Sequence, residues 1–176
     1  MPILKNNLRL VIFIIFSNIK IENSLSTNNL KLPTKQKPVT MWVHPSGPII
    51  GSLFIHKDNG QDQAILDILN QTEPFVVFQV DTPNEVRFYN RQSIIRIEYN
   101  DKDAISDSAQ TLYCIIHMMD GSQIDGTIKE ALPPEHARLY DYLNQQENRF
   151  LKIYVSDDEV CLINKSYINQ VTLPNK

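Results

Sequence analysis

An internal repeat constrains the fold of this chain more than any single motif does. Residues 39–100 align with residues 111–174, and the offset between matched positions varies only between 74 and 75. Because the matches keep their order and spacing, the sequence predicts two copies of one unit. The matched pairs include Gly51 with Gly126, Asp67 with Asp141, Asn70 with Asn144, Phe75 with Phe150, Glu85 with Glu159, and Asn90 with Asn164.

Each copy predicts about five short antiparallel strands and one helix. A β-branched and aromatic run opens each copy, and the Asp120–Gly121 pair in the second copy is a strong signal for a hairpin turn. A helix is expected after the second strand, over residues 61–70 in the first copy and from Pro133 in the second. The last strand run should bend at residues 90–92 and at residues 164–166.

The expected fold is therefore mainly β (α+β), with two tandem small bent antiparallel sheets that each carry one short helix between the second and third strands. A unit of roughly 60 residues is marginal alone, so we expect the copies to bury a shared face or to pair edge strands. The predicted organisation is a hydrophobic leader, a disordered linker, the first repeat, a second linker and the second repeat, at residues 1–21, 22–38, 39–100, 101–110 and 111–174.

The leader has two interpretations. A basic stretch precedes the apolar run at residues 10–16, which is the order of a secretory signal or anchor. The run is shorter than the roughly 20 residues of a membrane-spanning helix, and no Ala-x-Ala cleavage site follows it. A stray extension or an over-long gene start fits equally well. The localisation thus stays open between cytoplasmic and exported or tethered, with membrane contact only through residues 1–21.

The charge is unevenly distributed along the chain. Residues 1–38 carry a net charge of +5, whereas residues 39–176 hold 11 basic and 19 acidic residues, a net charge of −8. Binding to nucleic acid depends on Lys and Arg displacing counterions from phosphates. The acidic balance of the folded part therefore disfavours a nucleic-acid partner.

Residues 112–128 resemble the first two strands of Sm-like proteins, especially the bacterial Hfq branch, in which a strand, an Asn/Asp-Gly turn and a second Gly follow at this spacing. Residues 75–78 and 164–174 are similar to the third strand and the closing segment of that family. The resemblance implies a small β-barrel that binds RNA and forms rings. The helix between the second and third strands is an insertion, and Arg91-Gln92 and Lys165-Ser166 stand where the branch has Lys-His, whose His contributes to uridine-rich RNA recognition.

The motifs of catalysis and metal binding are missing from the sequence. The four histidines form no His-x-x-x-His or His-Glu-x-x-His spacing, and there is no glycine-rich phosphate loop or nucleophile motif. We predict no catalytic residue, no metal ligand and no cofactor. Cys114 and Cys161 are interpreted as small core residues, or as a disulfide if the protein is exported.

Two repeated polar segments are the candidate binding residues. Asn90-Arg91 and Asn164-Lys165 form the repeated polar–basic pair, which predicts either a ligand contact at a barrel rim or a bend in which Asn adopts unusual dihedral angles. Asn70 and Asn144 are expected to end the helices in a left-handed conformation.

Together these features favour a non-catalytic binding or assembly module. Its contacts would come from barrel rims or from sheet edges that pair with another protein chain, either a second copy or an assembly partner. Two alternatives remain, an RNA-binding Sm-like protein and an exported or membrane-tethered envelope domain.

Overall fold

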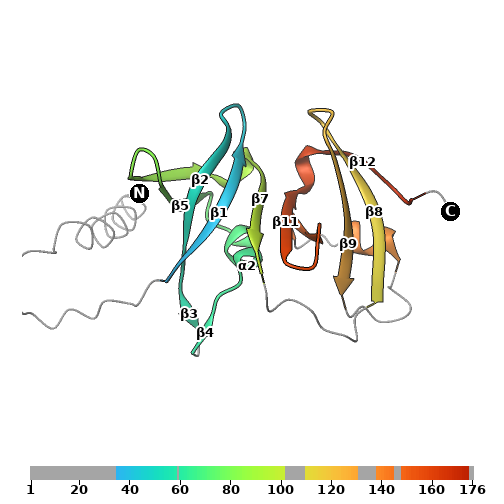
Figure 1. The fold of residues 1–176 in the computed structure, drawn as a ribbon, viewed down its shortest axis with the longest axis horizontal. Coiled ribbons are helices and arrows are strands. Elements are labelled where there is room, and N and C mark those ends of the chain that lie inside the picture. Colours follow the sequence, from blue (N-terminus) through green and yellow to red (C-terminus); the bar gives the residue numbers. More distant parts are fainter. Residues whose placement is uncertain (1–34, 59, 102–109, 131–137, 145–147, 175–176) are drawn as a thin grey trace, which may run out of the picture. The chain divides into compact units, whose positions relative to one another are not determined.

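A computed structural model describes residues 35–58, 60–101, 110–130, 138–144 and 148–174 of the 176-residue chain (Figure 1). Residues 34–176 cluster as one compact unit. The predicted leader at residues 1–21, residues 22–34 of the first predicted linker and residues 102–109 of the second lie outside the described residues. No helix in the described part is long and apolar enough to cross a membrane.

The first half of the described structure, residues 35–100, contains seven strands, one α-helix and one 3-10 turn. They are β1 (Lys35–Val43), β2 (Gly47–Ile55), β3 (Lys57–Asp58), β4 (Gln61–Asp62), α2 (Ile65–Asn70), β5 (Phe75–Val80), β6 (Glu85–Asn90), η1 (Arg91–Ser93) and β7 (Ile94–Asn100).

The second half, residues 110–172, repeats the main elements in the same order. They are β8 (Gln110–Met118), β9 (Gln123–Glu130), α3 (Leu139–Leu143), β10 (Phe150–Tyr154), β11 (Glu159–Asn164), η3 (Lys165–Tyr167) and β12 (Ile168–Thr172). The predicted bends after Asn90 and Asn164 are confirmed as η1 and η3. The predicted turn at Asp120–Gly121 is confirmed by a positive φ of 85° at Gly121.

Two predicted boundaries are wrong. Residues 35–38 belong to β1 and not to a disordered linker, because the β1–β2 pairing runs out to Lys35 opposite Ile55. The first helix begins at Ile65 and not at Gln61, because Gln61 and Asp62 pair with Asp58 and Lys57. The predicted start of the second helix at Pro133 lies outside the described residues.

The mainly β prediction is confirmed, and the main sheet is a single one. Ten antiparallel strands run in the order β12-β8-β9-β10-β11-β7-β1-β2-β5-β6, while β3 and β4 form a separate pair. The expected arrangement of two separate sheets is not confirmed, because β11 of the second half pairs with β7 of the first (Figure 1).

Two hydrophobic clusters fill the interior of this unit. The larger cluster combines most buried residues of the first half with four residues of the second half, and we call it the first core. The second core is built from the second half, with Ile95 of β7 packed against it. Cys114 and Cys161 are free thiols buried in the second core, which agrees with their interpretation as core residues.

Candidate functional site

The junction between the two halves is a strand pair. β11 and β7 run antiparallel over five residue pairs, so the backbone ladder continues from one half into the other. The pairs are Glu159 with Asn100, Val160 with Tyr99, Cys161 with Glu98, Leu162 with Ile97, and Ile163 with Arg96. In sheet order, β11 is the last strand of the second half and β7 is the first strand of the first half, and the two pair with each other.

Side chains of β10 and β11 are buried on both faces of the sheet at this junction. One alternating set packs into the first core, and the other set packs into the second core, because successive strand residues point to opposite faces. The first set is Phe150, Tyr154, Val160 and Leu162; the second set is Leu151, Ile153, Cys161 and Ile163. The junction therefore combines backbone hydrogen bonds with apolar burial.

Two asparagines hydrogen-bond across the junction. The Oδ1 of Asn70, at the end of α2, accepts a hydrogen bond from the backbone N–H of Phe150 at 3.0 Å. The Nδ2 of Asn164 donates to the carbonyl oxygen of Ile94 at 2.8 Å, and its Oδ1 accepts from the N–H of Ser166 at 3.0 Å. Asn164 is fully buried, so each of these bonds satisfies a group that water does not reach.

The predicted role of the helix-ending asparagines is wrong. The residues that cap α2 and α3, Gln71 and Asn144, have φ of −59° and −97°, outside the left-handed region. Asn70 is instead a link to β10, and the Nδ2 of Asn144 donates to the carbonyl oxygen of Tyr140 at 2.8 Å within its own helix. Matched residues of the two halves therefore have different partners.

The four predicted binding residues do not form one site. Asn90 and Arg91 lie at the end of β6, whereas Asn164 and Lys165 lie at the end of β11, and four strands separate β6 from β11 in the sheet. Both asparagines have extended backbones, with φ of −67° and −70°, so the expected unusual dihedrals are wrong and the bend is made by η1 and η3.

Arg91 is a buried residue of the fold. Its Nε donates to the carbonyl oxygen of Ile68 at 3.2 Å, and its Nη2 donates to Oε1 of Gln71 at 3.2 Å. Burial lowers the pKa of Arg91, because the surrounding protein solvates the cation less well than water does. The same cause lowers the pKa of Lys165, its counterpart in the second half. The Arg91 guanidinium thus holds the end of α2 through two hydrogen bonds.

The sheet has two outer strands, β6 and β12. In the part of the chain that the structure describes, β6 pairs with β5 alone and β12 with β8 alone. Phe75 and Phe88, beside and on β6, expose 53% and 43% of their surface. Their counterparts Phe150 and Leu162, at the same offsets of 75 and 74 in the second half, expose 1% and 0%.

The outer strand β12 also carries an apolar end. Leu173 directly follows β12 and exposes 63% of its surface, while its counterpart in the first half, Tyr99, is buried in the first core. Tyr140 of α3 is exposed, while its counterpart Leu66 of α2 packs against the first core. Each outer strand therefore leaves apolar side chains exposed at positions that are covered at the junction.

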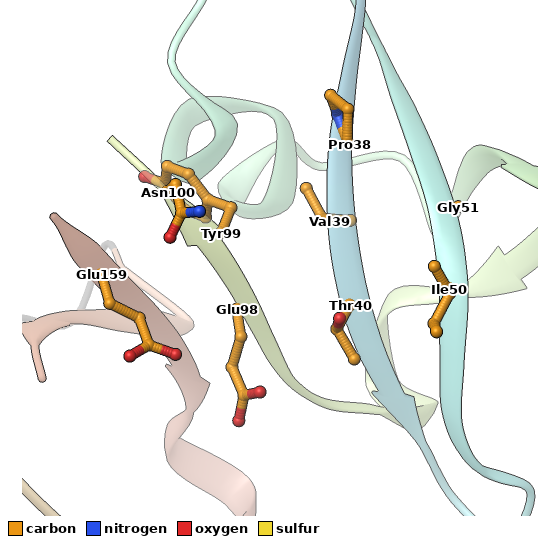
Figure 2. Close-up of a pocket in the computed structure, with 9 residues that line it drawn as sticks. All are labelled: Pro38, Val39, Thr40, Ile50, Gly51, Glu98, Tyr99, Asn100 and Glu159. Carbon is orange, nitrogen blue, oxygen red and sulfur yellow. The ribbon is translucent and has the colours of Figure 1, made fainter. Parts of the chain in front are cut away.

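A shallow pocket of about 260 Å³ lies beside the junction. Glu98, Tyr99 and Asn100 of β7 line it together with Glu159 of β11 and residues of β1 and β2, and Figure 2 shows the carboxylates of Glu98 and Glu159 on the same side of their strands. The Glu98 carboxylate already accepts a hydrogen bond from Nε of Arg96 at 2.7 Å.

Pairing of edge strands between the copies is one of the two arrangements expected from the sequence, and the β11–β7 ladder bears it out, whereas which two strands pair was not predicted. Strands buried on both faces read as continuous apolar runs. Residues 160–163 are such a run, whereas the matched strand of the first half, residues 85–90, includes Glu85 and Arg87. The difference between the matched strands was the available clue that only one of them is covered.

Among the described residues, no group of three or more His, Cys, Asp or Glu lies together in a way that could hold a metal ion. Comparison of the chain with protein-family models, with curated proteins and with solved structures finds no match.

Proposed function

We propose that this chain is a non-catalytic binding and assembly module, made of two tandem copies of an Sm-like β unit, which engages another protein chain through β6 and β12. The observation that carries the proposal is the contrast between matched strands. Phe75 on β5, beside the outer strand β6, and Phe88 on β6 are exposed, whereas Phe150 and Leu162 are buried where β11 has a partner strand.

The duplication is supported by the order of strands. Along the sheet, the first half reads β7-β1-β2-β5-β6 and the second reads β12-β8-β9-β10-β11. In each half this is the last strand of the half followed by its first four in chain order, when the short β3–β4 pair is set aside. The repeated order agrees with the sequence repeat and with the resemblance of both copies to Sm-like proteins.

The outer strands have the features of a docking edge. An outer strand presents unpaired backbone N–H and C=O groups, and such groups pair readily with a strand from another chain. Natural edges are protected by Pro, by charged side chains, especially Lys, or by β-bulges. Neither β6 nor β12 contains Pro or Lys between its bounds, while β6 carries Glu85 and Arg87, and the pairing of β12 with β8 shifts register between Ile168 and Gln170.

RNA binding by an Sm-like protein is the alternative function. It is less well supported, because Arg91 is buried against α2 and the net charge of residues 39–176 is −8. Export or tethering through residues 1–21 is a further hypothesis, and N-terminal sequencing of the mature protein tests it: a start between residues 17 and 40 would support export.

The experiment is a pull-down from the native host with the full chain and three variants. Phe88→Glu alters β6, Leu173→Glu alters the end of β12, and the control Ile50→Lys alters an exposed apolar residue on β2, which lies inside the sheet. We expect a protein partner, including a second copy of the chain, to be lost with at least one edge variant and kept with the control.

A partner that is captured equally well by the wild-type chain and by both edge variants would contradict the proposal. Filter binding to uridine-rich and adenine-rich RNA over a salt series separates the alternative, because phosphate contacts give a steep dependence of affinity on salt concentration.

A further inference from the structure

Arg91 is a buried cation with an unused hydrogen-bond donor. Only 2% of its surface is exposed, and its Nε and Nη2 donate to Ile68 and Gln71. Its Nη1 is buried as well, and it has no hydrogen-bond partner among the residues that the structure describes. Because a buried donor without an acceptor costs free energy, the Nη1 of Arg91 favours an acceptor from outside the described chain.

The positive charge of Arg91 is also uncompensated. Within the described ranges, none of the ion pairs includes Arg91. Burial is the main cause that lowers the pKa of Arg91, the exposed Glu73 partly opposes it, and the positive charge of Arg149 adds to it. Charges that are buried in proteins are ordinarily paired. A water molecule can accept a hydrogen bond from Nη1, but only an anion also neutralises the charge.

A small cavity of about 110 Å³ borders Arg91. His56 and Gln63, from the segment between β2 and α2, line it with polar side chains, while Phe54 of β2 and Val77 of β5 supply apolar walls. The cavity has room for several water-sized groups. Its size and its mixed lining therefore fit an anionic group attached to a short apolar chain.

From the unused donor, the uncompensated charge and the cavity beside them, we infer that Arg91 binds a small carboxylate, whose short apolar chain lies against Phe54 and Val77. A planar guanidinium matches the two oxygens of a carboxylate, and hydrogen bonds between charged groups are stronger than those between neutral ones. A phosphate presents oxygens on every side, so several of them would face the apolar walls without donors.

The site is not one that the resemblance to Sm-like proteins implies. Arg91 is held by Ile68 of α2 and by Gln71, which directly follows this helix, and the helix is an insertion relative to that family. The second half does not repeat the arrangement, because the counterpart of Arg91, Lys165, is only half-buried. The site is also separate from the partner chain proposed at β6 and β12, since its ligand is a small molecule.

The experiment titrates the full chain with propionate at constant ionic strength. Calorimetry measures the affinity, and the Nε–H resonance of Arg91 shows by NMR whether the ligand binds beside it. We expect a saturable single-site curve and a shift of that resonance. Propionamide has the same shape without the charge, so it should bind about tenfold more weakly or less.

Two pairs of variants test the residues. Arg91→Gln removes the charge and should weaken propionate binding about tenfold or more, whereas the same change at the matched position, Lys165→Gln, should leave the affinity within about twofold. Gln63→Phe fills the cavity and keeps the guanidinium, so it should also abolish binding. Its control is Gln61→Phe, at an exposed residue of β4 outside the cavity lining. If Arg91→Gln does not fold, Gln63→Phe still decides the result.

Several outcomes would overturn the inference. They are the absence of saturable propionate binding to the wild-type chain, equal affinities for propionate and propionamide, and binding that persists in Gln63→Phe or in a folded Arg91→Gln. Inorganic phosphate or uridine monophosphate that binds more tightly than propionate would also overturn it, because the site would then recognise a phosphate and not a carboxylate.

Discussion

Replacing Asn164 and Asn90 separately by alanine isolates the hydrogen bond that crosses the junction. The two asparagines are matched in the repeat, and each accepts a bond from the N–H two residues later, at 3.0 Å from Ser166 and at 2.9 Å from Gln92. Asn164 alone also donates to the carbonyl oxygen of Ile94, at 2.8 Å in a fully buried position. The difference between the two substitutions therefore reports that additional bond.

The magnitude follows from the burial. An intramolecular hydrogen bond contributes about 1 kcal/mol net, and a buried polar group left without its partner costs about 1–3 kcal/mol more. We expect Asn90→Ala to lower the free energy of unfolding by about 1 kcal/mol, because only the local bond is lost. Asn164→Ala should lower it by about 2–4 kcal/mol, since the donor to Ile94 is lost as well.

The assay is equilibrium unfolding in urea at a protein concentration where the chain is a single species, with the slope compared between variants to confirm that the same surface unfolds. Asn90→Asp serves as a control, because its carboxylate keeps the acceptor for Gln92 at a partly exposed position and should leave stability near that of wild type. Equal losses for Asn90→Ala and Asn164→Ala would refute the assignment of a stabilising bond across the junction.

Three further predictions concern the interior. Gly51→Ala should destabilise the fold more than Gly126→Ala, and each substitution should cost about 1–3 kcal/mol. A Cβ at Gly51 would collide with the backbone oxygen of Gln79 and with the Phe78 ring, whereas the nearest neighbour of a Cβ at Gly126 is the Ile153 side chain. Similar urea midpoints for the two variants would contradict this. Cys114 and Cys161 should react with a thiol reagent only at the rate of unfolding, and rapid labelling under native conditions would show that these thiols are accessible. Burial raises the pKa of Cys114 from 9.0 to about 11 and that of Cys161 from 9.0 to about 12. Above pH 9 the folded state therefore binds more protons than the unfolded state, so the free energy of unfolding should fall as the pH rises from about 9 to 12. A Cys114→Ala/Cys161→Ala variant should lose much of that fall between pH 9 and 10, and an unchanged slope would argue against the cysteines as its source.

The parts of the fold that depend on neighbouring residues could be predicted from the sequence. The turn at Asp120–Gly121, the bends after Asn90 and Asn164, and the apolar face of the first helix each follow from residue types within a few positions. Gly51 and Gly126 were also informative, because a strand that approaches its neighbour this closely leaves no space for a side chain. The ends of elements were less predictable, since pairing with distant strands carried β1 out to Lys35 and drew Gln61 into β4.

The sequence by itself predicted two matched units, and the tertiary structure decided what each member of a matched pair of residues does. Asn90 and Asn164, or Phe88 and Leu162, are matched along the chain, but the first of each pair lies on the outer strand β6 and the second lies on β11 at the junction. Burial and hydrogen bonding depend on which strand lies alongside, and that neighbour comes from residues about 65 positions away along the chain. Local residue spacing predicts the strands and their bends. The pairing of β11 with β7 joins residues that are far apart in the chain, so it does not follow from any short sequence pattern.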